Sequence, residues 1–162
     1  MQDLDSINFS VHRFLIPVTS TLLVRSARFV LVLFVLTALL GCSPLTLGNG
    51  LAPDHGFRVE KGISYGPQDR QKLDIYYPEL NRSEAPVIVF FYGGSWRRGD
   101  RWKYRFVGQA LSSRGYLTVI PDYRLYPEVR FPSFVEDGAA SVAWVRQHIP
   151  QSENGIILLG HS

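Results

Sequence analysis

The sequence predicts an α/β domain in which a mostly parallel sheet carries helices on both faces. Two observations lead to this prediction. Three apolar runs rich in β-branched and aromatic residues have the composition of strands buried on both faces, and amphipathic segments separate these runs. Two alternating segments come before the first run, so the order is strand, strand, then β-α-β-α-β, which is the order of a parallel sheet with helical crossovers.

The strands can be assigned in chain order. Residues 57–66 and 71–78 alternate apolar and polar side chains, as half-exposed strands do, and we expect them to pair as a hairpin. The three buried strands are predicted at residues 86–94, 116–124 and 155–162.

Two helices are predicted between the buried strands. The first extends from Asp100, which can cap its N-terminus, to Arg114. The second lies within residues 132–150, where Ser133 and Glu136 have the spacing of a capping box. Each helix would lie in a crossover and pack on a face of the sheet.

Composition and charge exclude several classes of protein. With 162 residues, 46% of them apolar and 19% charged, the chain suits one globular domain. A formal charge of +3 without a concentrated basic face does not favour a nucleic-acid partner. No cluster of His, Cys and Asp residues and no phosphate-binding glycine loop is present, so we expect neither a metal nor a cofactor.

The N-terminal residues 1–41 are interpreted as a lipoprotein-type signal peptide. The uncharged apolar run 29–40 follows Arg25 and Arg28, and it is shorter than the ~20 residues that cross a bilayer as a helix. The only cysteine, Cys42, follows directly, and the junction resembles the lipobox of bacterial lipoproteins. A buried structural thiol or an uncleaved membrane anchor are the alternatives.

This resemblance implies a lipid on Cys42, a membrane partner through that lipid, and a place in the bacterial cell envelope, at the outer membrane or the periplasmic face. Residues 42–56 are rich in Pro, Gly and Asn and are interpreted as a linker. The folded domain would then occupy residues 57–162.

The chemistry-bearing residues follow two of the buried strands. Ser162 comes after Gly160 at the carboxyl end of the last strand, where open α/β sheets place their ligands, and a sharp turn there would hold the serine in a strained conformation. We expect Gly160 to be required because a side chain would collide with that turn. Gly93 and Gly94 follow the first buried strand and could turn their N–H groups toward a ligand.

These residues resemble the α/β-hydrolase superfamily, and within it the bacterial esterase/lipase branch, over residues 57–162. The branch has an H-G-G-x-W oxyanion loop, which reads Y-G-G-S-W at 92–96 here. The resemblance implies that Ser162 is the nucleophile of a carboxylic ester hydrolase acting through an acyl-enzyme. It also implies that the backbone N–H groups of Gly93 and Gly94 form part of the oxyanion hole, and that the substrate is a small-molecule ester.

The resemblance covers only the N-terminal portion of this fold, up to the nucleophile elbow. The Asp and His of the triad follow the serine in chain order in this superfamily, and none of His12, His55, His148 and His161 is expected to act as the base. We expect Asp122 to brace its own turn and Asp137 to complement a helix dipole. The chain as given is therefore expected to be inactive.

Two other functions remain open at this point. An amidase of the arylformamidase kind would share every motif quoted above. A non-catalytic envelope lipoprotein could also keep a decayed hydrolase fold for binding.

Overall fold

The computed structural model describes residues 25, 28–32, 44–80 and 82–162. Arg25 and residues 28–32 are helical, and the chain from Ser43 onward forms a separate compact unit, which is described here by itself. Within the described ranges, no helix combines the length and the apolar character needed to cross a membrane. Cys42 and most of residues 1–41 lie outside these ranges, so the signal peptide and the lipidation remain predictions.

The five predicted strands are present and form one sheet in the order β1-β2-β4-β3-β5. Their bounds are β1 Phe57–Ser64, β2 Lys72–Pro78, β3 Val87–Phe91, β4 Thr118–Pro121 and β5 Ile156–Gly160. β1 pairs with β2 as the predicted antiparallel hairpin, and β2 is also antiparallel to β4. β3 runs parallel to both β4 and β5, so the carboxyl ends of these three strands meet at one edge of the sheet.

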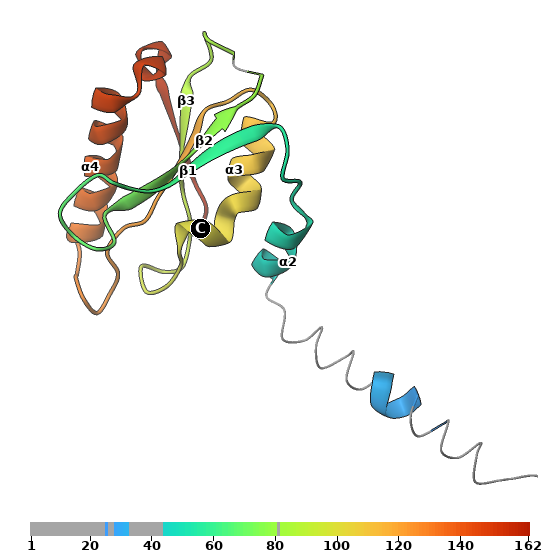
Figure 1. The fold of residues 1–162 in the computed structure, drawn as a ribbon. Coiled ribbons are helices and arrows are strands. Elements are labelled where there is room, and N and C mark those ends of the chain that lie inside the picture. The colour runs from blue at the N-terminus through green and yellow to red at the C-terminus, as the bar shows by residue number, and fades with distance from the viewer. Residues whose placement is uncertain (1–24, 26–27, 33–43, 81) are drawn as a thin grey trace, which may run out of the picture. The chain divides into compact units, whose positions relative to one another are not determined.

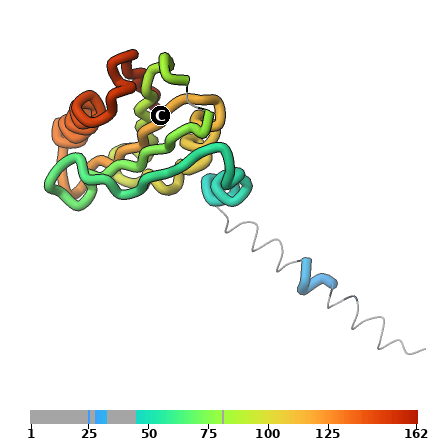
Figure 2. The backbone as a smooth tube through the Cα atoms, turned by 45° about the horizontal axis from the view of Figure 1, so that its top comes forward, coloured from blue at the N-terminus to red at the C-terminus, as the bar shows by residue number. Residues whose placement is uncertain are grey.

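Helices cover both faces of this sheet, which confirms the predicted architecture. The helical elements are α2 Pro44–Leu51, the 3-10 turn η1 Arg101–Tyr104, α3 Arg105–Ser112, α4 Ser133–His148 and the 3-10 turn η2 Pro150–Asn154. Figures 1 and 2 show α4 on one side of the sheet and α3 on the other. The α4 side is filled by aliphatic side chains such as Val87, Val89 and Val145, none of which is exposed.

The helix ends and the predicted linker differ from expectation. The N-cap of α4 is Pro132, and no side chain caps the helix, so the predicted capping box at Ser133 does not form. Residues 44–51, which composition assigns to a linker, form α2. The side chain of Asn49 explains how α2 is held, because its Oδ1 accepts from Phe106 N at 3.0 Å and its Nδ2 donates to Trp102 O at 3.0 Å.

The last strand is less buried than its apolar sequence predicts. Ile157, Leu158 and Leu159 are 48%, 60% and 40% exposed. β5 lies at the edge of the sheet with β3 as its one strand neighbour. Since α4 packs over the centre of the sheet, the side chains of β5 lie at the margin of that contact.

Candidate active site

Ser162 lies at the carboxyl end of β5 in the turned-out conformation that the sequence predicts. The ladder between β5 and β3 ends with a hydrogen bond from His161 N to Phe91 O at 3.0 Å. Ser162 then has φ 75°, a left-handed backbone conformation that residues with a side chain seldom adopt. This strained conformation lifts the serine out of the strand, toward the loop that follows β3.

A close contact in the structure requires glycine at Gly93. A Cβ built on Gly160 would meet nothing within 4 Å among the described residues, and its expected collision with the turn stays a prediction. A Cβ on Gly93 would lie 2.6 Å from His161 O and 2.8 Å from Ser162 Cβ. The loop after β3 therefore lies close to the turn at His161 and Ser162. Only glycine at position 93 leaves room for this approach.

The loop after β3 is turned by a run of left-handed residues. Gly94, Ser95 and Trp96 have φ values of 147°, 55° and 58°. Arg97 N donates to Gly94 O at 3.1 Å and closes the turn. In the part of the chain that the structure describes, the N–H groups of Gly93, Gly94 and Ser95 donate to no protein acceptor. Consecutive N–H groups in such a turn can bind an oxyanion.

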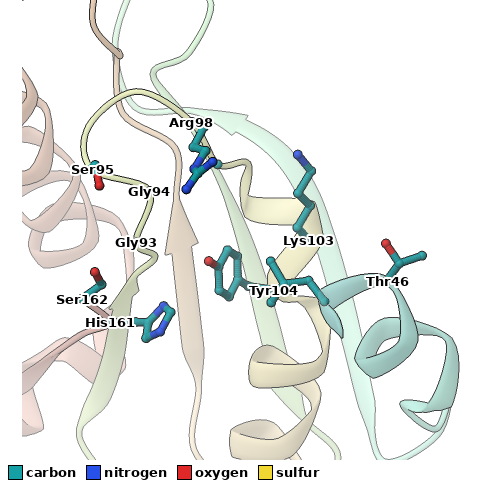
Figure 3. Close-up of a pocket in the computed structure, with 11 residues that line it drawn as sticks. Thr46, Gly93, Gly94, Ser95, Arg98, Lys103, Tyr104, His161 and Ser162 are labelled. Atoms are coloured by element: carbon teal, nitrogen blue, oxygen red, sulfur yellow. The ribbon is translucent and has the colours of Figure 1, made fainter. Parts of the chain in front are cut away.

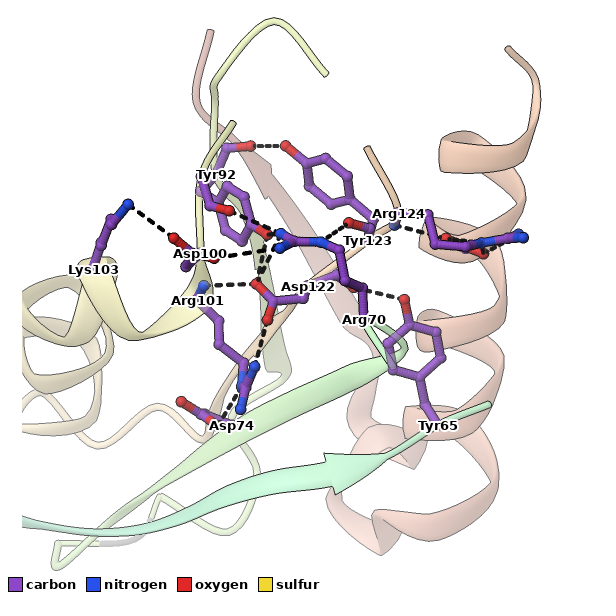
Figure 4. A network of polar contacts seen from close by, with 12 residues as sticks. Tyr65, Arg70, Asp74, Tyr92, Asp100, Arg101, Lys103, Asp122, Tyr123 and Arg124 are labelled. Atoms are coloured by element: carbon purple, nitrogen blue, oxygen red, sulfur yellow. Dashed lines mark hydrogen bonds and ion pairs between the residues drawn. The ribbon is translucent and has the colours of Figure 1, made fainter. Parts of the chain in front are cut away.

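Tyr92, the first residue of the Y-G-G-S-W stretch, anchors the start of this loop (Figure 4). Its hydroxyl donates to Asp122 Oδ1 at 2.5 Å and accepts from Arg70 Nη2 at 3.0 Å. The same guanidinium nitrogen donates to Gly99 O at 2.8 Å, at the far end of the loop. Burial, and then the carboxylate of Asp122, raise the pKa of Tyr92 above its usual range, so its proton stays in place at neutral pH.

Asp122 joins this anchor to η1. The expectation that it braces its own turn is wrong. Its carboxylate accepts from Arg101 N at 2.7 Å and forms an ion pair with the Arg101 guanidinium. That guanidinium also bonds Asp74 Oδ1 at 2.7 Å. The sequence does not indicate this network, because Arg70 lies in the turn of the predicted hairpin and Arg101 lies at the start of the predicted helix, far from each other in the chain.

Asp137 has a structural role, as expected, but through side-chain contacts and not through the helix dipole. It accepts from Arg124 N at 2.8 Å, from the Arg124 guanidinium at 2.7 Å, and from Gln71 Nε2 at 2.8 Å. Burial alone would raise the pKa of Asp137, but the hydrogen bonds from Arg124 and Gln71 outweigh it and hold the pKa below its usual value.

The described histidines are not positioned to take a proton from Ser162. His148 Nδ1 lies 2.8 Å from Trp144 O at the far end of α4, and His55 is exposed before β1. The ring of His161 lies 6.2 Å from that of Tyr104, and Figure 3 shows it directed away from the Ser162 hydroxyl. His12 lies outside the described residues.

Three cavities open beside Ser162, and two of them are the larger ones. The first, of about 530 Å³, contains Gly93 and Gly94 together with Ser162, so the three predicted site residues share one space. The second, of about 580 Å³, lies between the loop, β5 and α4. The described residues include no group of three or more His, Cys, Asp or Glu side chains that could hold a metal ion.

The comparisons with known proteins agree with this geometry. A family model named BD-FAE matches residues 73–162, which is more than half of the chain. The chain belongs to the BD-FAE family. A probable isoprenylcysteine alpha-carbonyl methylesterase of Arabidopsis thaliana, ICMEL1, is 33% identical over 107 residues, and the Drosophila melanogaster kynurenine formamidase is 28% identical over 119.

Solved structures show the same fold for this BD-FAE chain. Esterase B from Lactobacillus rhamnosis has a TM-score of 0.64 and 26% sequence identity, over 84% of this chain. The architecture is thus that of the α/β-hydrolase esterases. The matches span 22% of the Arabidopsis methylesterase, with 64% of this chain, and 37% of the Drosophila formamidase, with 73% of this chain. They span 44% of Esterase B.

Proposed function

We propose that this chain carries the nucleophile and the oxyanion-binding loop of a serine carboxylesterase. The observation that carries the proposal is the contact between Gly93 and Ser162, because it puts free backbone N–H groups and a strained serine on two sides of one cavity. The esterases among its relatives support the same reaction class.

The reaction follows from these positions. Ser162 Oγ attacks the ester carbonyl carbon, and negative charge develops on the carbonyl oxygen. The N–H groups of Gly93 and Gly94 stabilise that oxygen, and one well-placed donor lowers the barrier by about 3 kcal/mol. Loss of the alcohol leaves an acyl-enzyme on Ser162, which water then hydrolyses to release the acid.

The proton of Ser162 needs a base, since a neutral serine hydroxyl is a weak nucleophile. No histidine among the described residues is placed to act as that base. We therefore propose that the base and its carboxylate partner lie outside the described residues. As the sequence analysis predicts, we expect the 162-residue chain alone to be inactive.

The test uses 4-nitrophenyl butyrate with two preparations, the 162-residue chain and the product of the complete reading frame that contains it. Each is compared with its own Ser162→Ala variant. We expect the complete product to release nitrophenol well above its variant, and the 162-residue chain to match its variant. Hydrolysis by the 162-residue chain above Ser162→Ala would contradict the proposed inactivity. A complete product no faster than its variant would contradict the esterase and favour a non-catalytic binding protein.

An arylformamidase-like amidase is the second candidate, and the similarity to kynurenine formamidase favours it. Both reactions use the same serine and the same oxyanion loop. The ratio of kcat/KM for an aryl ester and for the matching N-formyl arylamine separates them, with a ratio well above one for the esterase.

We also propose that Cys42 is lipidated and anchors the protein in the bacterial envelope. The apolar segment before this single cysteine supports the proposal. Metabolic labelling with a fatty-acid analogue should mark the wild-type chain and leave Cys42→Ala unmarked. Label that survives in Cys42→Ala would refute it.

A further inference from the structure

The two larger cavities beside Ser162 differ in charge. The larger one is lined by apolar and aromatic side chains, including Trp96 and Phe134, whose rings stack 4.8 Å apart. The other contains two cations, Arg98 and Lys103, and no carboxylate among its lining residues. A negatively charged group would be favoured in this second cavity and poorly solvated in the first.

Arg98 is the cation without a partner. Across the described ranges its guanidinium takes part in no hydrogen bond or ion pair, whereas the neighbouring Arg101 is bound by two buried carboxylates. Lys103 Nζ bonds Asp100 Oδ2 at 2.8 Å, and the guanidinium of Arg97 lies over the ring of Tyr126. The free charge in the cavity therefore belongs to Arg98.

The loop fixes where this guanidinium can reach. A Cβ on Gly94 would lie 1.9 Å from Arg98 O and 3.3 Å from Arg98 Cγ, so the backbone and stem of Arg98 lie directly against the oxyanion loop. Gly99 follows with φ 118° and packs on the ring of Tyr92. Figure 3 shows the guanidinium in the cavity, beside Gly94 and on the side facing Tyr104.

We propose that Arg98 binds an anionic group of the substrate, a carboxylate or a phosphate, beside the bond that Ser162 cleaves. The planar guanidinium can bond such a group in bidentate fashion, and Lys103 at the same cavity adds positive charge. The substrate class is thus an ester with a negative charge on one side of the scissile bond. This inference rests on the proposed function for the identity of the reacting bond, but the anion site itself can be tested without turnover.

The test measures binding to the Ser162→Ala chain, which cannot form an acyl-enzyme. One probe pair carries the charge on the alcohol part, 4-acetoxybenzoate against its methyl ester. The other carries it on the acyl part, monophenyl glutarate against methyl phenyl glutarate. We expect the charged member of at least one pair to bind about tenfold more tightly than its neutral partner, and the advantage to shrink as salt is added. The pair that responds identifies the side of the ester that faces Arg98.

Variants separate this site from general surface charge. Adding Arg98→Ala to the Ser162→Ala chain should abolish the tighter binding of the charged probe. Arg98→Lys should keep part of this preference, because the charge remains but the bidentate geometry is lost. Arg97→Ala is the matched control and should keep all of it, because this adjacent arginine does not line the cavity. Equal binding within both pairs, or a preference that survives Arg98→Ala, would overturn the proposal. An esterase assay that fails while the preference persists would overturn the proposed function alone.

Discussion

The loop after β3 and the strand β5 contribute the two halves of the candidate site, and they are held in different ways. Tyr92 is 2% exposed and stacks between Tyr104 and Tyr123, at ring distances of 5.3 and 4.9 Å. Its hydroxyl belongs to the buried network of Asp122. β5 has no comparable side-chain network in the described residues, and Leu158 at its centre is 60% exposed.

The difference shows which half of the site this chain fixes by itself. The loop after β3 is preformed, since side-chain hydrogen bonds and ion pairs position its start and its end. Ser162 is positioned by the backbone ladder to β3 and by the close contact with Gly93. Changes in the network should therefore act through stability, and changes near β5 through the position of the serine.

The largest effect is expected from Asp122→Asn. The change removes the carboxylate that pairs with Arg101 and accepts from Tyr92, and breaking a buried ion pair costs about 3–5 kcal/mol in the free energy of unfolding. Urea unfolding of the purified chain measures it. The exposed Asp69→Asn is the matched control and should change stability by less than about 0.5 kcal/mol. Similar losses in the two variants would show that the network does not stabilise the loop.

A pair of leucine truncations compares the interior of the sheet with its edge. Leu73 on β2 is fully buried, so Leu73→Ala should lower the free energy of unfolding by about 2–5 kcal/mol. Leu158→Ala removes the same atoms from a largely exposed position and should cost less than about 1 kcal/mol. A large loss for Leu158→Ala would mean that β5 is covered in solution by something other than the described residues.

Gly93→Ala tests the contact between the two halves. The added methyl would overlap His161 O and Ser162 Cβ, and overpacking of this kind costs about 1–3 kcal/mol. We expect faster hydrogen exchange at the β5 amides in this variant. Gly50→Ala is the control, because it lies in α2 with open space around it and should be neutral or stabilising by up to about 1 kcal/mol. Unchanged hydrogen exchange at the β5 amides in Gly93→Ala would show that Gly93 does not contact the turn at His161 and Ser162.

Sequence patterns predicted the strands and the fold class because buried strands and amphipathic helices have strong periodic signals. They could not predict the network around Asp122, since its partners Arg70 and Arg101 are separated from it by 52 and 21 residues in sequence and meet only in the folded chain. For the same reason the sequence could not predict the close contact that requires glycine at Gly93, because Gly93 and Ser162 are far apart in sequence and meet only in the folded chain.

The smallest effect is expected from pH, through Asp137. Its pKa in the folded chain lies below that of an unfolded aspartate, about 3.9, so its ionised form contributes stability above that pH. The contribution is lost as the pH falls through the folded-state pKa and Asp137 takes up a proton.

Asp137→Asn should therefore lose more stability at pH 7 than at pH 3. The fall in unfolding free energy between these pH values should be smaller in this variant than in the wild type. Asp69→Asn gives the baseline for loss of one carboxylate. An acid dependence as steep in Asp137→Asn as in Asp69→Asn would mean that the ion pair with Arg124 adds nothing to stability, and that the loop after β4 is held by its backbone alone.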